Sequence, residues 1–557
     1  MRKWLLWLLW AAVPASAQKP VFRHPLDIPI QLSSNFGEIR SDHFHTGYDF
    51  RTQGKTGFPV YAAASGFVSR IKVSATGFGK VIYLMHPNGY MTVYAHLDSF
   101  ARPVAALIRS EQYRRQSFEV EVFPEPGRFP VQQGDLIGYS GNSGTSSGPH
   151  LHFEIRDASG ESFPLNPYPF LPIPDSMPPV ISRLYVYPIR QFCEPVQPHS
   201  AAVSRNNGRH LLAPDSLITH FPVIGLGVQV KDFYDASQSD LGVYRLELEV
   251  DDSVVYAMQL DRLVFGNGRY VNAHIDYGAF QDRSVVVQKL FREPGDQNSI
   301  YQRVKNSGYV DLSDRRWRLV VIRAADASGN KSVLRFRIRF SGAEQPPAAL
   351  QGVCVKFQEG YKYRSDSVRV NIPPGALYRD AEFLVRPLNQ RSFFSARYQL
   401  GHAHIPLHQP MEIALLPART LLQKKQSMVV VQLNNGKPKA LASRWEDGWL
   451  VASARNFGTY TIMADTLQPL ILPRNVSQNQ ALSGRYVHFT VRDDLTGITS
   501  YSAHLNGQWV LMEYDPKEDR MTVVLDEPLK AGRHVLRLSV SDAVHNQATY
   551  ELSFLKK

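Results

Sequence analysis

HLHFEIRD, residues 150–157, is the stretch that decides how the first part of this chain folds. In a β-strand, successive side chains point to opposite faces, so His150, His152 and Glu154 share one face. The apolar residues between them point to the other face, into a core. Two imidazoles therefore stand side by side on the polar face of an expected strand.

Two other stretches carry the same residue types. HTGYD at 45–49 has a histidine and an aspartate four residues apart, which on a strand share one face, and Gly47 allows close backbone approach. YAHL at 94–97 adds His96. Four imidazoles and one carboxylate are enough to hold Zn²⁺ and leave groups over for acid/base chemistry, so they predict a hydrolase. Glu154 either holds a ligand histidine by its second ring nitrogen or forms an outward salt bridge.

The surrounding sequence predicts short strands joined by glycine-rich turns. Pro87-Asn88-Gly89 is a hairpin signal, and this hairpin is expected to deliver His96 to a strand end. RPVAALIRSEQYRRQ at 102–116 differs, because its spacing and charge predict a helix that either walls a groove or simply connects strands. The predicted strands are 67–73, 80–86 and 90–96.

The three motifs resemble those of the lysostaphin-like, or LytM-type, zinc endopeptidases, which cut peptide bridges in bacterial cell walls. Residues 45–49 match the family pattern H-x-G-x-D, residues 94–97 match [YA]-x-H-[LM], and residues 150–152 match H-L-H. The resemblance extends from about residue 32 to residue 156, and it implies a mostly antiparallel β catalytic domain.

Position by position, the resemblance implies that His45, Asp49 and His152 bind Zn²⁺. It places His96 and His150 on the open side of the ion, as the catalytic residues. A zinc-activated water, whose pKa falls to about 7, would attack the scissile carbonyl. One of the two catalytic histidines would take the proton, and the other would stabilise the oxyanion or protonate the leaving amine. The sequence does not divide these roles between them.

The N-terminus predicts export. Basic residues 2 and 3 precede an apolar run at 4–13, and Ala15-Ser16-Ala17 fits signal peptidase cleavage, so residues 1–17 are a predicted signal peptide. We expect the protein in the periplasm or cell envelope, or secreted. No later segment reaches the roughly 18 apolar residues that a membrane-spanning helix needs, so no transmembrane segment is expected.

The chain is basic, with a formal net charge of +12. A basic exported protein is attracted to polyanionic envelope material, although an ordinary soluble surface of mixed sign gives the same value. No basic run has interleaved aromatic residues, which argues against a nucleic-acid partner.

The two cysteines, Cys193 and Cys354, lack the Cys-x-x-Cys spacing of a thiolate zinc knuckle or a redox motif. An oxidising compartment would permit a disulfide between them. Because they are expected in different domains, the sequence favours two buried thiols.

The rest of the chain predicts an all-β protein of several domains. Residues 165–179 are proline-dense, which predicts a stiff linker after a catalytic domain at 18–164. Residues 325–330 and 541–546 resemble each other, and each predicts a turn between the last two strands of a β-sandwich. The further domains that we expect are an Ig-like sandwich at 180–345, a β domain at 346–465 and a second Ig-like sandwich at 466–557.

The sequence therefore predicts an exported zinc metalloendopeptidase that hydrolyses peptide cross-links of peptidoglycan. One alternative is a non-catalytic LytM-type regulator of other cell-wall hydrolases, against which the complete set of expected ligands argues. The other is an envelope scaffold or adhesin-like protein, which the long β-rich tail suggests. That tail either binds cell-wall or envelope protein partners or acts as a spacer. The scissile bond is not marked in the sequence.

Overall fold

The structure is a computed structural model that describes residues 22–159, 163–190, 193, 197–206, 208–235, 237–344, 346, 349–388, 394–418, 424–525 and 529–557. The predicted signal peptide lies outside the described residues. Within them, no helix is both long enough and apolar enough to cross a membrane. We divide the described chain into four units: unit 1 (residues 22–165), unit 2 (180–340), unit 3 (353–464) and unit 4 (470–556).

Unit 1 is one antiparallel sheet of eleven strands with a single long helix. Its main path runs β1-β2-β10-β6-β5-β4-β7, and β3, β8, β9 and β11 pair at its margins. The bounds are β1 Leu32–Ser34, β2 Tyr48–Arg51, β3 Pro59–Tyr61, β4 Gly66–Val73, β5 Lys80–Met85, β6 Tyr90–Phe100, α1 Arg102–Arg115, β7 Val120–Val122, β8 Pro130–Val131, β9 Leu136–Ser140, β10 His150–Asp157 and β11 Phe163–Leu165.

The expected strands, helix and turn of unit 1 are confirmed, but the expected strand positions of His45 and His96 are wrong. The three expected strands are β4, β5 and β6, the expected helix is α1, and Gly89 takes the positive φ of +81° that its turn requires. The apolar residues of β10, at 151, 153 and 155, are fully buried, as strand alternation predicts.

His45 lies before β2, which begins at Tyr48, so it is not on a strand. His96 lies inside β6 and not at a strand end. Its φ is +59°, and the pairing of β5 with β6 shifts register there, so that Ala95 and His96 together face Val81. This β-bulge re-aims a side chain in the middle of a strand, which alternation does not predict.

Unit 2 is a sheet of thirteen strands with short helices between β19 and β22. In β24 Leu334, Phe336, Ile338 and Phe340 are buried and alternate with the outward-facing Val333, Arg335, Arg337 and Arg339, which is the alternation of a half-buried strand. The bounds are β12 Val180–Pro188, β13 His199–Asn206, β14 Arg209–Leu212, β15 Ser216–Thr219, β16 Val223–Tyr234, β17 Ser237–Leu241, β18 Arg245–Val250, β19 Ser253–Gln259, η1 Phe265–Tyr270, α2 Val271–His274, α3 Tyr277–Arg283, β20 Gln288–Lys289, β21 Tyr301–Val304, η2 Asn306–Gly308, β22 Val310–Asp311, β23 Arg318–Ala325 and β24 Lys331–Phe340.

Unit 3 has two five-stranded sheets and a two-stranded ribbon around its own core. The bounds are β25 Val353–Val355, β26 Tyr361–Arg364, β27 Val368–Ile372, β28 Ala381–Phe383, β29 Val385–Leu388, β30 Arg397–Leu400, β31 Pro406–Leu415, β32 Met428–Asn434, β33 Lys437–Ala440, β34 Ser443–Glu446, β35 Trp449–Asn456 and β36 Gly458–Ala464.

Unit 4 has a four-stranded and a five-stranded sheet with a separate core between them. The bounds are β37 Leu470–Pro473, β38 Gln480–Ala481, β39 Tyr486–Arg492, β40 Ile498–Leu505, β41 Gln508–Val510, β42 Met512–Asp515, η4 Pro516–Glu518, β43 Arg520–Val524, β44 Gly532–Asp542 and β45 Gln547–Lys556. The two expected turns join β23 to β24 and β44 to β45. The predicted domain boundaries and the Ig-like class stay predictions.

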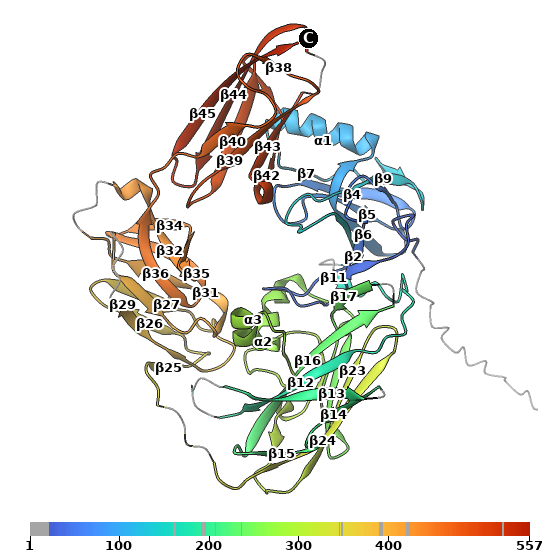
Figure 1. Cartoon of the computed structure of the whole chain (residues 1–557), viewed down its shortest axis with the longest axis vertical. Helices are drawn as coiled ribbons and strands as arrows, with labels where there is room; N and C mark the ends of the chain where they lie inside the picture. The colour runs from blue at the N-terminus through green and yellow to red at the C-terminus, as the bar shows by residue number, and fades with distance from the viewer. Residues whose placement is uncertain are drawn as a thin grey trace, which may run out of the picture.

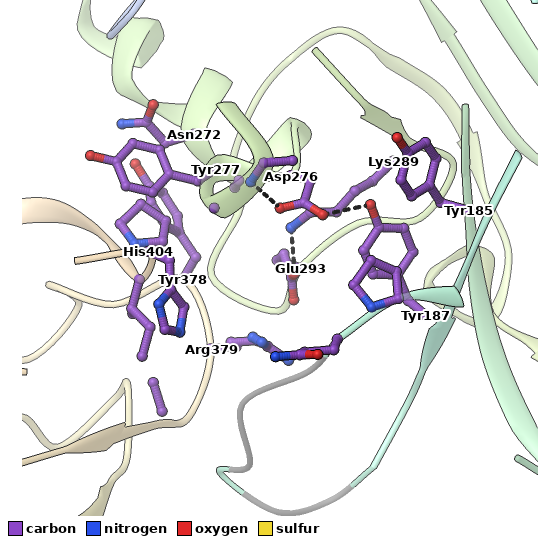
Figure 2. A pocket seen from close by; sticks show the side chains of 18 of the residues that line it. Tyr185, Tyr187, Asn272, Asp276, Tyr277, Lys289, Glu293, Tyr378, Arg379 and His404 are labelled. Atoms are coloured by element: carbon purple, nitrogen blue, oxygen red, sulfur yellow. Dashed lines mark hydrogen bonds and ion pairs between the residues drawn. The ribbon is translucent and has the colours of Figure 1, made fainter. Parts of the chain in front are cut away.

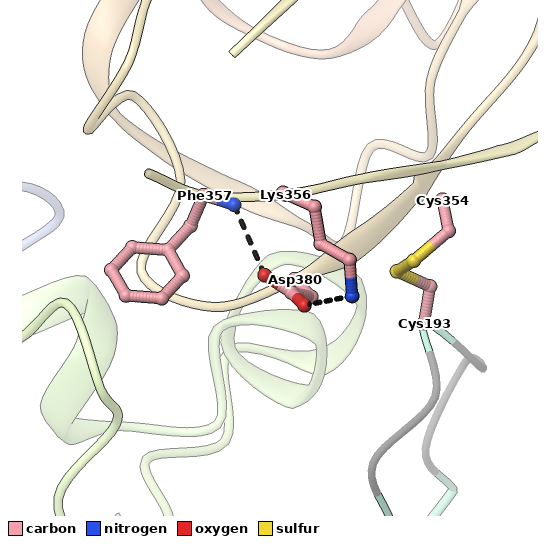
Figure 3. Close-up of a disulfide and its surroundings, with 5 residues drawn as sticks. All are labelled: Cys193, Cys354, Lys356, Phe357 and Asp380. Atoms are coloured by element: carbon pink, nitrogen blue, oxygen red, sulfur yellow. Dashed lines mark hydrogen bonds and ion pairs between the residues drawn. A yellow bond between two sulfur atoms is a disulfide. The ribbon is translucent and has the colours of Figure 1, made fainter. Parts of the chain in front are cut away.

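The expectation of two buried thiols is wrong. Cys193 and Cys354 form a disulfide, with their Cα atoms 5.4 Å apart (Figure 3). The two residues do belong to different units, but units 2 and 3 pack against each other there. The disulfide therefore links the two units covalently.

The four units are arranged as a ring, so that red unit 4 lies beside blue unit 1 (Figure 1). Side chains join the two units directly. The contacts are Lys517 Nζ to Asn142 O (2.6 Å), Lys80 Nζ to Glu513 Oε2 (3.3 Å) and the Trp509 ring, edge-on to the ring of Tyr113 on α1 (5.1 Å between centroids). The end of the chain thus returns to the unit that carries the candidate site.

Candidate metal centre

Strand pairing brings two of the sequence motifs together. β2 and β10 are antiparallel neighbours whose register sets Asp49 directly opposite His152. The chain enters β2 through Gly47, where an added Cβ would lie 2.2 Å from the carbonyl oxygen of Phe153. Only glycine tolerates that approach, so Gly47 has the role that the sequence suggested.

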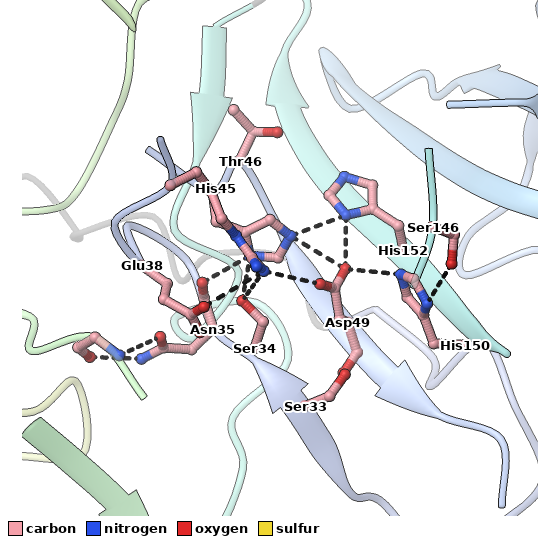
Figure 4. A network of polar contacts seen from close by, with 12 residues as sticks. Ser33, Ser34, Asn35, Glu38, His45, Thr46, Asp49, Ser146, His150 and His152 are labelled. Atoms are coloured by element: carbon pink, nitrogen blue, oxygen red, sulfur yellow. Dashed lines mark hydrogen bonds and ion pairs between the residues drawn. The ribbon is translucent and has the colours of Figure 1, made fainter. Parts of the chain in front are cut away.

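Three ligand atoms converge on one point (Figure 4). His45 Nε2 lies 3.1 Å from Asp49 Oδ1 and 3.0 Å from His152 Nδ1, and His152 Nδ1 lies 2.8 Å from Asp49 Oδ1. The three residues are buried, and these atoms belong to a group that could hold a metal ion. Ligand atoms of a tetrahedral zinc site stand about 3.4 Å apart for bonds of about 2.0–2.1 Å, so the spacing fits Zn²⁺.

The second nitrogen of each ring is committed elsewhere. His45 Nδ1 donates to the carbonyl oxygen of Asn35 (2.8 Å), which leaves Nε2 with its lone pair toward the centre. His152 Nε2 donates to Glu154 Oε1 (2.9 Å), which leaves Nδ1 free in the same way. Both tautomers are the ones that a metal ligand needs.

Glu154 takes the first of the two alternatives that the sequence left open: it holds His152 by the second ring nitrogen, and its salt bridge is buried and not outward. Besides holding His152, it pairs through Oε2 with Arg156 Nε at 2.5 Å, and Thr46 Oγ1 donates to its other oxygen. Burial alone would raise the pKa of Glu154, but Arg156 and His152 lower it to about 2. The residue is therefore an anion within the core of unit 1.

The electrostatics of the centre favour a cation. Burial would raise the pKa of Asp49, yet His45 and His152 hold it well below its ordinary value. Burial would lower the pKa of His152, but its hydrogen bonds to Asp49 and Glu154 raise it to about 9. Arg40, which the sequence did not single out, reaches Asp49 Oδ2 at 3.3 Å and steadies that carboxylate.

The remaining two histidines lie beside this centre. His150 Nε2 is 3.6 Å from Asp49 Oδ1, and the His150 and His96 rings are 4.8 Å apart between centroids. The Nδ1 atoms of both rings donate to backbone carbonyls, that of His150 to Gly148 and that of His96 to Ser143, each at 2.8 Å. Burial lowers the pKa of both rings, that of His96 to about 3, so both are neutral near pH 7 with Nε2 as an acceptor.

Phe78 is a further residue at the site that sequence reasoning missed. Its ring stacks on His152 at 5.1 Å and lines a cavity of about 230 Å³ next to the centre. The far wall of this cavity comes from unit 2, with Leu263 and Phe265. The two glycines that flank Phe78, Gly77 and Gly79, could have pointed to it in the sequence. No feature of the sequence marks the residues of unit 2 that form the far wall.

A roomier cavity of about 500 Å³ lies between units 2 and 3 (Figure 2). Within it, Tyr187 donates to Asp276 (2.9 Å), and Lys289 pairs with Glu293 (2.7 Å). None of the predicted site residues is among the described residues that line it. We therefore place the candidate site at the histidine cluster of unit 1.

Two known families match parts of the chain. Residues 43–112 and 126–167 match peptidase family M23, which covers the whole histidine cluster. Residues 353–465 match the Zu5-like domain.

Curated relatives match over the same N-terminal region. A protein of Haemophilus influenzae named "uncharacterized metalloprotease" is 33% identical over 143 residues, 24% of this chain and 24% of that protein. The DD-carboxypeptidase/endopeptidase Mpg of Neisseria meningitidis serogroup B is 31% identical over 151 residues, 26% of this chain and 28% of that protein. The murein hydrolase activator NlpD of Salmonella dublin is 30% identical over 162 residues, 29% of this chain and 34% of that protein.

The chain thus spans between a quarter and a third of the length of these relatives. Among solved structures, the catalytic domain of lysostaphin from Staphylococcus simulans is 26% identical with a TM-score of 0.19, and the match covers 25% of this chain and 91% of that one.

Proposed function

This chain carries a peptidase M23 domain, and from that premise we propose that it is a zinc-dependent endopeptidase that hydrolyses peptide cross-links of bacterial peptidoglycan. The observation that carries the proposal is the convergence of His45, Asp49 and His152, each buried and each turned toward one point. The proposal takes these three side chains as the zinc ligands. It takes His96 and His150 as the catalytic residues.

Zn²⁺, when bound, supplies a Lewis acid that lowers the pKa of a water molecule and polarises the scissile carbonyl. The chain's own residues then move the protons. Because His96 and His150 are neutral and present Nε2 as an acceptor, either ring can take the proton of the attacking water. A ring that has gained this proton becomes a donor to the oxyanion or to the leaving amine.

The cavity beside His152 supports a peptide substrate with a small or apolar side chain. Its walls include the rings of Phe44, Phe78 and Phe265, with the aliphatic Leu263 between them. Such a surface favours apolar over charged groups. We propose that it receives a substrate residue next to the scissile bond.

The main alternative is a regulator of other cell-wall hydrolases, since one relative is named as a murein hydrolase activator. All five polar side chains of the proposed catalytic centre are present here, which favours catalysis. A second alternative is an envelope scaffold, for which units 2 to 4 would supply the binding surfaces. We also propose export to the periplasm, the envelope or the medium, because residues 1–17 have the features of a signal peptide.

Metal analysis and digestion of purified sacculi test the proposal together. Wild-type protein should carry about one zinc per chain and release new amine ends from sacculi, whereas His152→Ala should lose both. His220→Ala is the control, because His220 is an exposed histidine of unit 2 whose ring contacts Ser341. It should retain both properties.

A zinc-loaded wild-type protein that releases no amine ends would favour the regulator. If His152→Ala were as active as His220→Ala, the assignment of the site would be wrong.

A further inference from the structure

Two clusters of three aspartates occur outside the histidine site, one in unit 2 and one in unit 4. In each cluster one carboxylate oxygen per residue lies within 4.8 Å of the others. The first cluster, triad A, is Asp175, Asp232 and Asp326, and the second, triad B, is Asp465, Asp493 and Asp542.

The two triads are built in the same way. Asp326 follows β23, and Asn330, four residues later, donates Nδ2 to Asp326 Oδ2 (2.7 Å) and to the carbonyl oxygen of Asp175 (3.1 Å). In unit 4 the turn after β44 repeats this pattern at equal distances. There Asn546 donates Nδ2 to Asp542 Oδ2 (2.7 Å) and to the carbonyl oxygen of Asp465 (3.1 Å).

Each triad contains a buried carboxylate oxygen without a partner. Asp232 is only 3% exposed, and its Oδ1 accepts no hydrogen bond from any described residue. In the corresponding position of triad B, Asp493 Oδ1 is likewise buried and unpartnered within the described chain. A buried carboxylate oxygen that accepts no hydrogen bond is costly unless an ion or a water meets it.

Triad A also has room for an ion. Its three carboxylates line a cavity of about 40 Å³, which exceeds the volume of about 10–15 Å³ that one water-sized particle needs. No arginine or lysine of the described residues forms an ion pair with these three aspartates.

We propose that each triad binds one Ca²⁺ ion and thereby fixes the segment that enters a β unit onto that unit. All the available ligands are carboxylate and carbonyl oxygens, which Ca²⁺ prefers, and neither triad contains the nitrogen or sulfur ligands that zinc favours. Asp175 lies between units 1 and 2, and Asp465 lies between units 3 and 4. One ion therefore stabilises the connection between units 1 and 2, and the other stabilises the connection between units 3 and 4.

Triad A adjoins the histidine site as well. The cavity that it lines is closed on the unit 1 side by Leu32, Asn35 and Phe36. Asn35 also exchanges two hydrogen bonds with Gly242 of unit 2, at 2.7 and 2.8 Å, and its carbonyl oxygen accepts from His45. Calcium in triad A would thus stabilise the contact between units 1 and 2 at Asn35, the residue whose carbonyl oxygen orients His45.

Calorimetric titration of the full-length chain with CaCl₂, after chelation and restoration of zinc, tests the proposal. We expect two Ca²⁺ per wild-type chain, one for Asp232→Asn, one for Asp493→Asn and none for the double variant. Asp240→Asn is the matched control, because Asp240 lies nearby on β17 but is 52% exposed and paired with Lys231. It should bind two.

Thermal unfolding separates an ion site from a merely structural aspartate. Calcium at about a hundred times its dissociation constant should raise the Tm of the wild type by about 5 °C, and less in Asp232→Asn. Without calcium, Asp232→Asn should melt no lower than the wild type, because it removes one of three crowded charges. No Ca²⁺ binding by the wild type, two sites retained in both single variants, or an equal shift with MgCl₂ would overturn the proposal.

Discussion

Each ligand histidine is oriented by the partner of its second ring nitrogen. For His152 this partner is Glu154, a fully buried anion that also balances Arg156. A carboxylate in this position fixes the tautomer and raises the basicity of the ligand nitrogen. We therefore expect the affinity for zinc to depend on Glu154, which is not one of the proposed ligands.

Glu154→Gln should weaken zinc binding about 10- to 100-fold, because the amide can accept from His152 but carries no charge. Competition with a chelating dye measures this. Glu121→Gln is the control, because Glu121 forms a comparable pair with Arg70 at the surface. Equal zinc affinity in the two variants would contradict the role of Glu154.

His274 predicts a pH dependence of stability that is separate from the metal centre. Burial lowers its pKa to about 4, against which the hydrogen bond with Gln288 acts in the opposite direction. The unfolded chain, with an ordinary histidine pKa of about 6.5, binds the proton more readily, so stability falls as the pH drops from about 6.5 toward 4.

The wild type should lose more unfolding free energy than His274→Gln when the pH falls from 7 to 5, and the difference should be about 2 kcal/mol. Melting curves at the two pH values measure this difference, with the exposed His43→Gln as control. If the wild type and His274→Gln lose the same stability, the buried neutral histidine is not the cause.

At this scale, the sequence predicted which residues meet but not what surrounds them. The ligand set His45, Asp49 and His152 came from the resemblance of HTGYD and HLH to the family motifs. Strand alternation accounts for Asp49 and His152, which lie on β2 and β10, but not for His45, which precedes β2. The positions of Arg40 and Phe78 depend on loops whose paths follow from tertiary contacts, so no periodicity marks them.

At the scale of elements, the pairing of β2 with β10 builds the centre. Gly47 lies against the backbone of β10, with its hypothetical Cβ 2.2 Å from Phe153 O and 2.9 Å from the Glu154 side chain. A side chain there would push the two strands apart. It would also displace Glu154 from His152.

Gly47→Ala should cost about 1–3 kcal/mol in stability through overpacking and should weaken zinc binding at the same time. Gly266→Ala is the control, because an added Cβ there meets no atom within 4 Å. Denaturant unfolding and zinc titration measure the two effects. Two variants of equal stability would contradict the close approach of β2 and β10.

The strands and α1 were predictable because alternation and helical spacing are properties of short segments. The bulge that carries His96 was not. Its positive φ accompanies register shifts of β6 against its hairpin partner β5 and against β9, a strand more distant in the sequence, and strand alternation does not mark such shifts.

At the scale of the whole molecule, unit 4 contacts the loop that orients His96. Lys517 Nζ donates to the carbonyl oxygens of Asn142 (2.6 Å) and Gly144 (3.3 Å), and Ser143 between them accepts from His96 Nδ1. The C-terminal unit therefore steadies a proposed catalytic ring.

Lys517→Met should lower kcat about 5- to 10-fold and leave the zinc content unchanged, since it removes a charged hydrogen bond to that loop. Lys556→Met is the matched control, because Lys556 donates to the carbonyl oxygen of Gly484 within unit 4. Steady-state hydrolysis of a cross-linked peptide measures the effect. Equal kcat values in the two variants would contradict a role of unit 4 in the site.

The contact between unit 4 and unit 1, which closes the ring, could not be predicted from the sequence. Contacts such as Lys517 with Asn142 join residues with no local pattern in common. The expectation that Cys193 and Cys354 are two free thiols was wrong for the same reason. It assumed that residues of different units lie far apart, whereas these two form a disulfide.

The central claim is that this histidine cluster hydrolyses a peptide bond in peptidoglycan. The most direct test is digestion of a defined cross-linked muropeptide dimer by the zinc-loaded full-length chain, with the products identified by mass. We predict two monomers whose summed mass exceeds that of the dimer by one water, and an intact dimer with His150→Ala that retains its zinc. An intact dimer with folded, zinc-loaded wild-type protein would contradict the claim.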